Sequence, residues 1–303
     1  MLDFKKDKNY ESSTTINWFP GHMAKARREL KEDLKLVDLV AEIVDARIPI
    51  SSRNPDLPSI CEGKPRIVVL NKTDLVDKNL VKYWIDFYAQ KNIVCVTFST
   101  KERQSKNVFR NKVLEIMKEK LDSWKSKGIL NRKLRVMIVG IPNVGKSAFI
   151  NNFAGNSKAK VENKPGVTRK NQWFSAGNEL EFLDTPGVLW PKFEDKETAY
   201  NLAITGAIKQ SILDIEELAI YFVDKIKNFY PEKLQERYKI DITAIKDIDN
   251  YELLNLIGKK RGFLISGGEI DTLRTSEMLL EEFRSGKLGK ILLEYPENIE
   301  LRK

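Results

Sequence analysis

The run Gly140-Ile-Pro-Asn-Val-Gly145-Lys146-Ser147 constrains the fold of this chain more than any other sequence feature, because it matches the pattern GxxxxGK[ST]. The apolar residues 134–140 lead into it with a strand pattern, and AFINNF begins a helical pattern after it. Glycines let backbone N–H groups wrap a phosphate, and the following helix presents its positive end. Lys146 is then expected at the β- and γ-phosphates of a nucleoside triphosphate, and the Ser147 hydroxyl on Mg²⁺. The residues expected to contact nucleotide here are Asn143, Val144, Gly145, Lys146, Ser147 and Ala148.

Strand-like and helix-like segments alternate ahead of Trp190, which is typical of a doubly wound, mostly parallel α/β sheet. The strand-like segments are 39–47, 65–70, 92–98, 134–140 and 180–184, and the last of these is the final clear strand. From Lys196 onward only helical patterns occur, at 196–208, 214–229, 231–239, 249–260 and 272–285. Gly286 and Gly289 are expected to loosen the chain after the final helix. We expect an α/β domain over 1–190, with an N-terminal arm and helix over 1–37, and an all-helical domain over 196–303.

Asn71-Lys72-Thr73-Asp74 follows the second predicted strand and indicates recognition of guanine. The Asp74 carboxylate can accept hydrogen bonds from the ring N–H and the exocyclic amine of guanine, whereas adenine offers neither donor and would leave that carboxylate unpaired. Asn71 would bind the imidazole side of the base, and Lys72 would lie along the ring. An NKxD pattern alone is also ordinary turn chemistry. The triplet Ser99, Thr100 and Lys101 after the next strand strengthens the prediction, because it matches the loop whose backbone N–H contacts the guanine carbonyl.

Two further motifs favour a γ-phosphate switch. Asp184-Thr-Pro-Gly187 follows the last predicted strand, so that Asp184 would hold Mg²⁺ through water and the Gly187 amide would sense the γ-phosphate. Thr168, in Pro165-Gly-Val-Thr-Arg169, would complete the Mg²⁺ shell. Each motif alone could be a simple turn, but the four nucleotide motifs together, each at a strand end, predict a GTP- and GDP-binding P-loop protein with Mg²⁺.

The order of the motifs is the reverse of the usual one. Ordinary GTPases have the phosphate loop, switch threonine and DxxG ahead of NKxD and SxK, whereas here NKxD and SxK come first. Because the cyclic order is intact, the fold can close with its original termini joined through residues 101–133 and a new break after Gly187. The sequence therefore predicts a circularly permuted GTPase domain whose second switch leads directly into the helical domain.

The charge distribution leaves two interpretations open. The net charge is +9, and between Lys101 and Arg135 twelve Lys/Arg stand against four Asp/Glu, an excess of +8. This basic segment is either a surface facing a polyanion or a solvated helix face. No apolar run approaches the roughly 18–20 residues of a membrane span, and residues 1–15 lack a secretory signal. The two cysteines lack metal-ligand spacing, so we expect a cytoplasmic protein without a membrane partner.

Together with the nucleotide motifs, four further segments resemble the circularly permuted GTPases of ribosome assembly, specifically the ribosome biogenesis GTPase A family. They are Asn17-Trp-Phe-Pro-Gly-His-Met-Ala-Lys-Ala26, Asp45-Ala-Arg-Ile-Pro49, Ser52-Arg-Asn-Pro55 and Phe283-Arg-Ser-Gly-Lys-Leu-Gly289. The resemblance implies a GTPase that binds the maturing large ribosomal subunit and hydrolyses GTP during a late step of its assembly. It also implies that the helical domain contacts ribosomal RNA. We expect a monomer away from the ribosome.

Catalysis needs an explanation, because Val188 stands where many GTPases have the glutamine that orients water. The enzyme is therefore expected to be slow alone and stimulated by the subunit. His22, the only histidine, aligns with a family histidine proposed to act in catalysis, and would join Lys146 and Thr168 as a catalytic residue. The alternative is that His22 only caps or packs against the first helix. Asn143 resembles an asparagine that helps coordinate K⁺ in related GTPases, the alternative being that it only tolerates the loop geometry.

Two rival functions remain at this stage. One is a GTPase of tRNA modification or membrane work, which shares the phosphate-loop asparagine. The other is a binding module that uses GTP as a ligand without turnover, an interpretation motivated by Val188.

Overall fold

The computed structural model describes residues 28–129, 131–154, 172–186, 196–208, 213–245 and 247–296. After a helical stretch at 28–34, strands and helices alternate. These elements are β1 (Leu39–Asp45), α2 (Leu57–Ile60), β2 (Arg66–Asn71), a 3₁₀ turn (Thr73–Leu75), α3 (Lys78–Gln90), β3 (Cys95–Phe98), α4 (Ser105–Ile116), α5 (Lys118–Ser126), β4 (Leu134–Val139), α6 (Lys146–Phe153), β5 (Gln172–Ala176) and β6 (Leu180–Asp184). The later elements are helices: α7 (Lys196–Ile204), α8 (Ile215–Phe229), α9 (Pro231–Tyr238), α10 (Ile242–Ile245), α11 (Asn250–Arg261) and α12 (Thr272–Arg284).

The strands form one six-stranded sheet in the order β3-β2-β1-β4-β6-β5. All neighbouring pairs are parallel except β5 with β6. From the central pair, β1 leads outward to β2 and β3, whereas β4 leads to β6 on the other side. The strand order therefore changes direction between β1 and β4, and ligands bind in the crevice at the carboxyl ends of strands at such a point. The predicted doubly wound α/β fold with permuted motif order, followed by helices, is confirmed.

Strand β5 is a difference from the sequence prediction, which placed only one strand in this region. Its residues pair antiparallel with β6, with Trp173 opposite Leu183. Only Phe174 and Ala176 of the strand are buried, because β5 lies at the edge of the sheet. A five-residue edge strand leaves too little alternation to be distinguished from a loop.

The sheet is covered on both faces, as parallel strands require. On one face, Phe109 of α4 and Phe149 of α6 pack with Phe182 of β6, and the rings of Phe109 and Phe149 lie 5.0 Å apart edge to face. On the other face, Trp84 of α3 packs in a cluster with Val44 and Leu70. Every residue of β1 is buried as a result.

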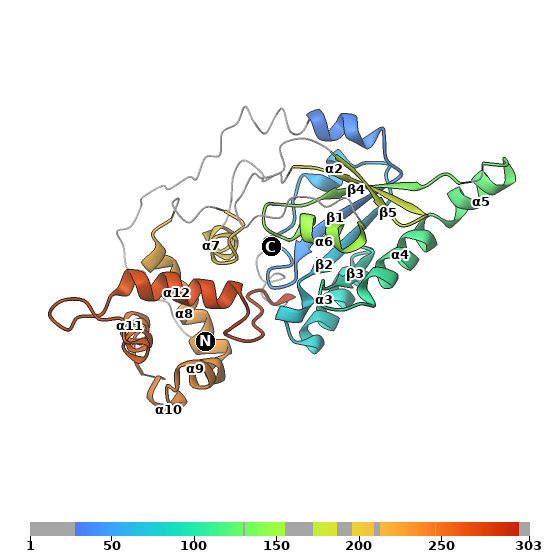
Figure 1. Cartoon of the computed structure of the whole chain (residues 1–303). Coiled ribbons are helices and arrows are strands. Elements are labelled where there is room, and N and C mark those ends of the chain that lie inside the picture. Colours follow the sequence, from blue (N-terminus) through green and yellow to red (C-terminus); the bar gives the residue numbers. More distant parts are fainter. Residues whose placement is uncertain are drawn as a thin grey trace.

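The later helices gather around α8, which packs against α7, α9, α11 and α12. Figure 1 shows this helical part at one end of the sheet, with α5 projecting at the opposite end. Aspartates cap α8, α11 and α12, where their carboxylates accept backbone N–H groups: Asp214, Asp249 and Asp271. Within the described residues, no helix combines the length and apolarity needed to cross a membrane.

The chain does not loosen after α12, contrary to the expectation drawn from its glycines. Gly286 lies so close to the guanine-motif loop that a Cβ there would approach Leu75 Cδ2 to 2.7 Å. The C-terminal segment, defined here as residues 286–294, then packs onto the sheet, where Leu292 joins the cluster around Trp84. This glycine serves a close approach of two segments rather than flexibility.

Candidate guanine-nucleotide site

The carboxyl ends of β1, β2, β3 and β4 lie along one edge of the sheet, and each leads into a predicted nucleotide motif or its neighbour. The phosphate loop connects β4 to α6, the NKxD segment follows β2, and Ser99 follows β3. Asp45 ends β1 directly beside them, paired in register with Asn71. Parallel pairing therefore brings segments that are far apart in sequence together at the carboxyl ends of the strands.

The glycines of the phosphate loop are required by close backbone approaches. A Cβ on Gly140 would lie 2.5 Å from the carbonyl oxygen of Ile43. Gly145 has a φ of 99°, and a Cβ there would lie 2.4 Å from Asn71 Nδ2. No other residue type fits either position without moving β1 or the NKxD segment.

Lys146 lies inside the phosphate loop. Its side chain is buried, and Nζ donates to the carbonyl oxygens of Gly140 and Ile141 at 3.0 Å each. Burial lowers the pKa of this amine to about 8, partly opposed by the negative charge of Asp184. The ammonium is thus held at the centre of the loop, in an environment that disfavours its charge and would gain from an anion.

Two hydrogen bonds join the NKxD segment to the phosphate loop. Asn71 Nδ2 donates to the carbonyl oxygen of Val144 at 2.7 Å, and Lys72 Nζ donates to that of Asn143 at 2.7 Å. Lys72 takes the left-handed conformation, with a φ of 62°, as does Asn143 with a φ of 61°. The base-recognition motif and the phosphate motif therefore form one unit across 71 residues of sequence.

Asp74 is held by the triplet that follows β3. Ser99 Oγ donates to Oδ1 at 2.8 Å, and Lys101 Nζ pairs with Oδ2 at 2.7 Å. Burial would raise the pKa of Asp74, but these hydrogen bonds and the Lys101 charge outweigh it and lower that pKa. The carboxylate is therefore ionised at neutral pH and acts only as an acceptor, which suits a partner with two N–H donors.

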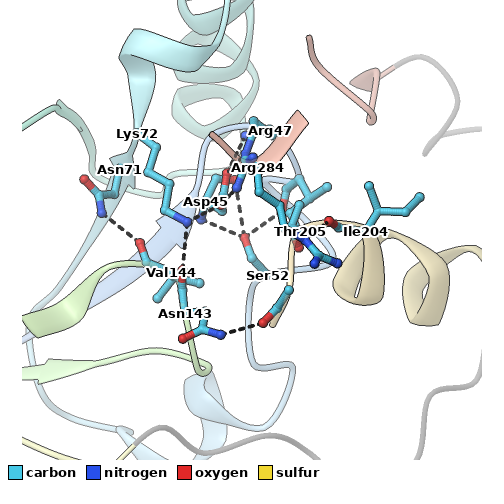
Figure 2. A network of polar contacts seen from close by, with 12 residues as sticks. Asp45, Arg47, Ser52, Asn71, Lys72, Asn143, Val144, Ile204, Thr205 and Arg284 are labelled. Atoms are coloured by element: carbon cyan, nitrogen blue, oxygen red, sulfur yellow. Dashed lines mark hydrogen bonds and ion pairs between the residues drawn. The ribbon is translucent and has the colours of Figure 1, made fainter. Parts of the chain in front are cut away.

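The structure adds two residues to which sequence reasoning gave no role, Asp45 and Arg47. Arg47 donates to both carboxylate oxygens of Asp45, with Nε at 2.9 Å from Oδ1 and Nη2 at 2.7 Å from Oδ2. Lys72 Nζ donates to the same Oδ2 at 2.9 Å, as Figure 2 shows. Burial would raise the pKa of Asp45, but the charges of Arg47 and Lys72 hold it well below its ordinary value. The available signal was an acidic residue ending a mostly apolar strand, with an arginine two positions on.

The described residues gather most of the predicted site. At the carboxyl ends of the strands, or in the segments directly after them, lie Asn71, Lys72, Asp74, Ser99, Thr100, Lys101, Asn143, Val144, Gly145, Lys146, Ser147, Ala148 and Asp184. The predicted residues His22, Thr168 and Gly187 lie outside the described residues.

Ser147 and Asp184 are oxygen donors beside the phosphate loop. Asp184 is buried at the end of β6, paired in register with Ile138 of β4, and its charge reaches Lys146. Among the residues that the structure covers, no three His, Cys, Asp or Glu side chains gather as a metal site. Mg²⁺ is usually held by one or two protein oxygens together with phosphate and water, so this sparse donor set fits a nucleotide-bound Mg²⁺.

Comparisons with known proteins find GTPases similar to this chain. The profile of a family described as a 50S ribosome-binding GTPase matches residues 135–257, a match that begins at β4 and leaves β1 to β3 ahead of it. The chain is 49% identical to ribosome biogenesis GTPase A of Bacillus cereus, over 93% of this chain and 94% of the relative. It is 30% identical to ribosome biogenesis GTPase A of Thermotoga maritima, over 94% of this chain and 96% of the relative. The crystal structure of GNP-bound YlqF from T. maritima is similar, with a TM-score of 0.62 and 27% identity, over 90% of this chain and 99% of that one.

Replacing Asp74 should change base preference. In Asp74→Asn the new amide N–H₂ group would face the exocyclic amine of guanine, and two donors cannot form a hydrogen bond. Xanthine has a carbonyl oxygen at the position of that amine, and this oxygen would accept a hydrogen bond from the new amide. We expect the affinity for GDP to fall by about tenfold to a thousandfold, while xanthosine diphosphate gains affinity. Fluorescence titration with labelled nucleotides measures both.

The matched control is Asp77→Asn, the same change at the exposed N-cap of α3, which should leave both affinities unchanged. If Asp74→Asn preferred GDP over xanthosine diphosphate by the same ratio of affinities as the unsubstituted chain, the assignment of the base to this loop would be contradicted.

Proposed function

Because this chain belongs to the ribosome biogenesis GTPase A family, and is therefore a GTPase, we propose that it binds the maturing large ribosomal subunit and hydrolyses GTP there during a late step of assembly. The observation that carries the proposal is the pair of hydrogen bonds from Asn71 and Lys72 to the phosphate loop. They hold the base-recognition segment directly beside the phosphate segment, so that a single nucleotide could contact both. The division into a GTPase domain over 1–190 and a helical domain over 196–303 belongs to the same proposal.

In the proposed complex, Asp74 accepts the two N–H donors of guanine and Lys72 lies along the base. Lys146 exchanges its carbonyl partners for phosphate oxygens, which gives its ammonium a stronger, charged partner. GTPases of this kind generally use Mg²⁺, which neutralises charge that develops on the phosphates. Ser147 would bind it directly, Asp184 through water, and Thr168 would complete its shell in the GTP state, with the Gly187 amide on the γ-phosphate.

Water activation is assigned to His22, because the hydrophobic Val188 cannot orient water. Imidazole can position or deprotonate water near neutral pH. The resulting enzyme turns over slowly until the subunit brings His22 to the γ-phosphate. This coupling would restrict hydrolysis to the assembled complex.

Asn143 is proposed as a ligand of K⁺. Its Nδ2 donates to the carbonyl oxygen of Gly206 at 2.6 Å, so Oδ1 is the atom left for a cation. A monovalent cation beside the phosphates would supply positive charge like that of an arginine finger.

The ribosomal RNA surface is proposed to include the basic segment as well as the helical domain. On α5 and the turn after it, Lys118, Lys125 and Lys127 are exposed, at the end of the molecule farthest from the helical part (Figure 1). Exposed lysines at this end suit contact with folded RNA, because phosphate contacts dominate the affinity of proteins for RNA.

Purified large subunits are expected to raise GTP turnover by about tenfold or more, and His22→Ala to lose most of that gain while keeping its affinity for GDP. Phosphate release with and without subunits measures this. Turnover that subunits do not raise would favour a GTP-binding module. A failure to co-sediment with subunits in the presence of a non-hydrolysable GTP analogue would contradict subunit binding itself.

Replacing Na⁺ by K⁺ at constant ionic strength should raise turnover, and the gain should disappear in Asn143→Ala. The same phosphate-release assay reports both. Equal turnover in the two salts would exclude the assignment of Asn143 to K⁺.

Charge removal on α5 should weaken subunit binding and flatten its salt dependence. For the pair Lys125→Gln and Lys127→Gln, the slope of log affinity against log salt should fall by about 0.7–0.9 for each phosphate that the variant no longer neutralises. The control pair is Lys78→Gln and Lys82→Gln on α3, also exposed, for which no change is expected. An unchanged slope in the variant with both α5 substitutions would contradict RNA binding by the basic segment and favour its interpretation as a solvated helix face.

A further inference from the structure

The Asp45 and Arg47 pair connects the base-recognition segment to the helical part of the chain. Both side chains are almost fully buried, 2–3% exposed. Beyond its two bonds to Asp45, the Arg47 guanidinium lies 4.7 Å from the centre of the Phe283 ring. Its Nη1 also lies 3.5 Å from the Phe283 carbonyl oxygen. The last turn of α12 thus fixes Arg47, Arg47 fixes Asp45, and Asp45 fixes the ammonium of Lys72.

The residue next to Phe283 reaches the other half of the site. Arg284 donates to the carbonyl oxygens of Ile204 at 2.8 Å and Ala203 at 2.6 Å, and so caps the carboxyl end of α7. In the turn that follows, the Gly206 carbonyl accepts the amide of Asn143 from the phosphate loop at 2.6 Å. Arg284 therefore supports the turn that holds the phosphate loop.

The C-terminal segment reinforces the same contact. The Ile291 amide donates to the Leu75 carbonyl at 3.1 Å, directly after the NKxD residues, and the Leu293 amide donates to the Arg47 carbonyl at 2.9 Å. Glu294 accepts the backbone N–H groups of Ile50 at 2.7 Å and Ser51 at 3.0 Å. The loop after β1 and the loop after β2 are thus both tied to residues that follow α12.

We propose that Phe283 and Arg284 are positioning residues for the nucleotide: Phe283 holds Lys72 on the base through Arg47 and Asp45, and Arg284 holds Asn143 on the phosphates through α7. The helical part then sets the lifetime of the bound nucleotide, and any partner that moves α12 away from the sheet accelerates GDP release. This inference rests on the proposed placement of guanine at Asn71–Asp74 and of phosphates at the phosphate loop.

The contacts argue against a purely structural role for this pair. α12 could be packed by apolar residues alone, as Leu279 and Leu280 of the same helix are. Instead its last turn presents an aromatic face to a buried guanidinium, and then a second guanidinium to the end of α7. Hydrogen bonds and cation–π contacts of a guanidinium depend on distance and orientation. A small displacement of α12 would therefore weaken them more than it would weaken apolar packing.

The test measures GDP release from the full-length chain by stopped flow, with a fluorescent GDP displaced by excess unlabelled GDP. In Phe283→Leu and in Arg284→Gln the dissociation rate should rise by about tenfold, the size expected when one charge-assisted interaction is removed. The matched control is Leu254→Ala, which removes a fully buried side chain from the same helical core without touching the network. The control should lower the melting temperature but leave the dissociation rate unchanged.

A double-mutant cycle separates positioning from general loosening. If Phe283 acts through Lys72, then Phe283→Leu should accelerate release little or not at all in a Lys72→Gln background, whereas independent effects would multiply. Wild-type release rates in both Phe283→Leu and Arg284→Gln, or an acceleration as large in Leu254→Ala, would overturn the inference. The proposed site would fail separately, through an unchanged base preference in Asp74→Asn.

Discussion

The Asp45 carboxylate holds two cations: Arg47, which is buried with it almost completely, and Lys72, whose side chain is 26% exposed. An unpaired charge at such a position is costly, so removal of one partner from a buried pair typically destabilises a protein by about 3–5 kcal/mol. Arg47 binds both oxygens, and Lys72 shares one of them with it. The position of the base-recognition lysine therefore depends on a carboxylate at the end of β1 rather than on its own loop. Because Lys72 also bonds the Asn143 carbonyl, the phosphate loop depends on the same carboxylate.

The sheet explains why a permuted chain can build this arrangement. A site at the carboxyl ends of parallel strands depends on which strands are neighbours, not on the order in which the chain makes them. β1 and β4 are neighbours with Leu39 opposite Val136, although about a hundred residues separate them. The segment that joins the two halves contains α4, which packs on one face of the sheet, and α5, which projects at the end opposite the helical part (Figure 1). Permutation therefore leaves the nucleotide site intact and changes only what is attached to it, which here is the helical part after β6.

The sequence motifs were sufficient to predict the fold and to select a candidate site, most of whose described residues lie together in the structure, because each motif is local. Gly145, Lys146 and Ser147 act within one loop, and Asp74 acts within another. The Asp45 cluster could not be predicted in the same way, since its partners are set by strand register and by a helix more than two hundred residues away. Strand β5 was missed because an edge strand with two buried residues carries almost no pattern. The expectation that Gly286 loosens the chain was wrong because glycine permits both a flexible backbone and a close contact between segments. Its contact with Leu75, which is distant in sequence, shows that the close contact applies here.

The C-terminal segment has a consequence for how the protein becomes active during its own synthesis. Leu292 completes a core cluster with Val44 and Trp84, and the amides of Ile291 and Leu293 pair with carbonyls beside the base-recognition loop. These partners are translated about two hundred residues earlier, so the first three strands leave the translating ribosome before the residues that complete their packing exist. Such long-range closure is slow compared with local folding. The nascent chain therefore carries its guanine motif in an unfinished form until residues 291–293 are made and pack against the strands that precede them.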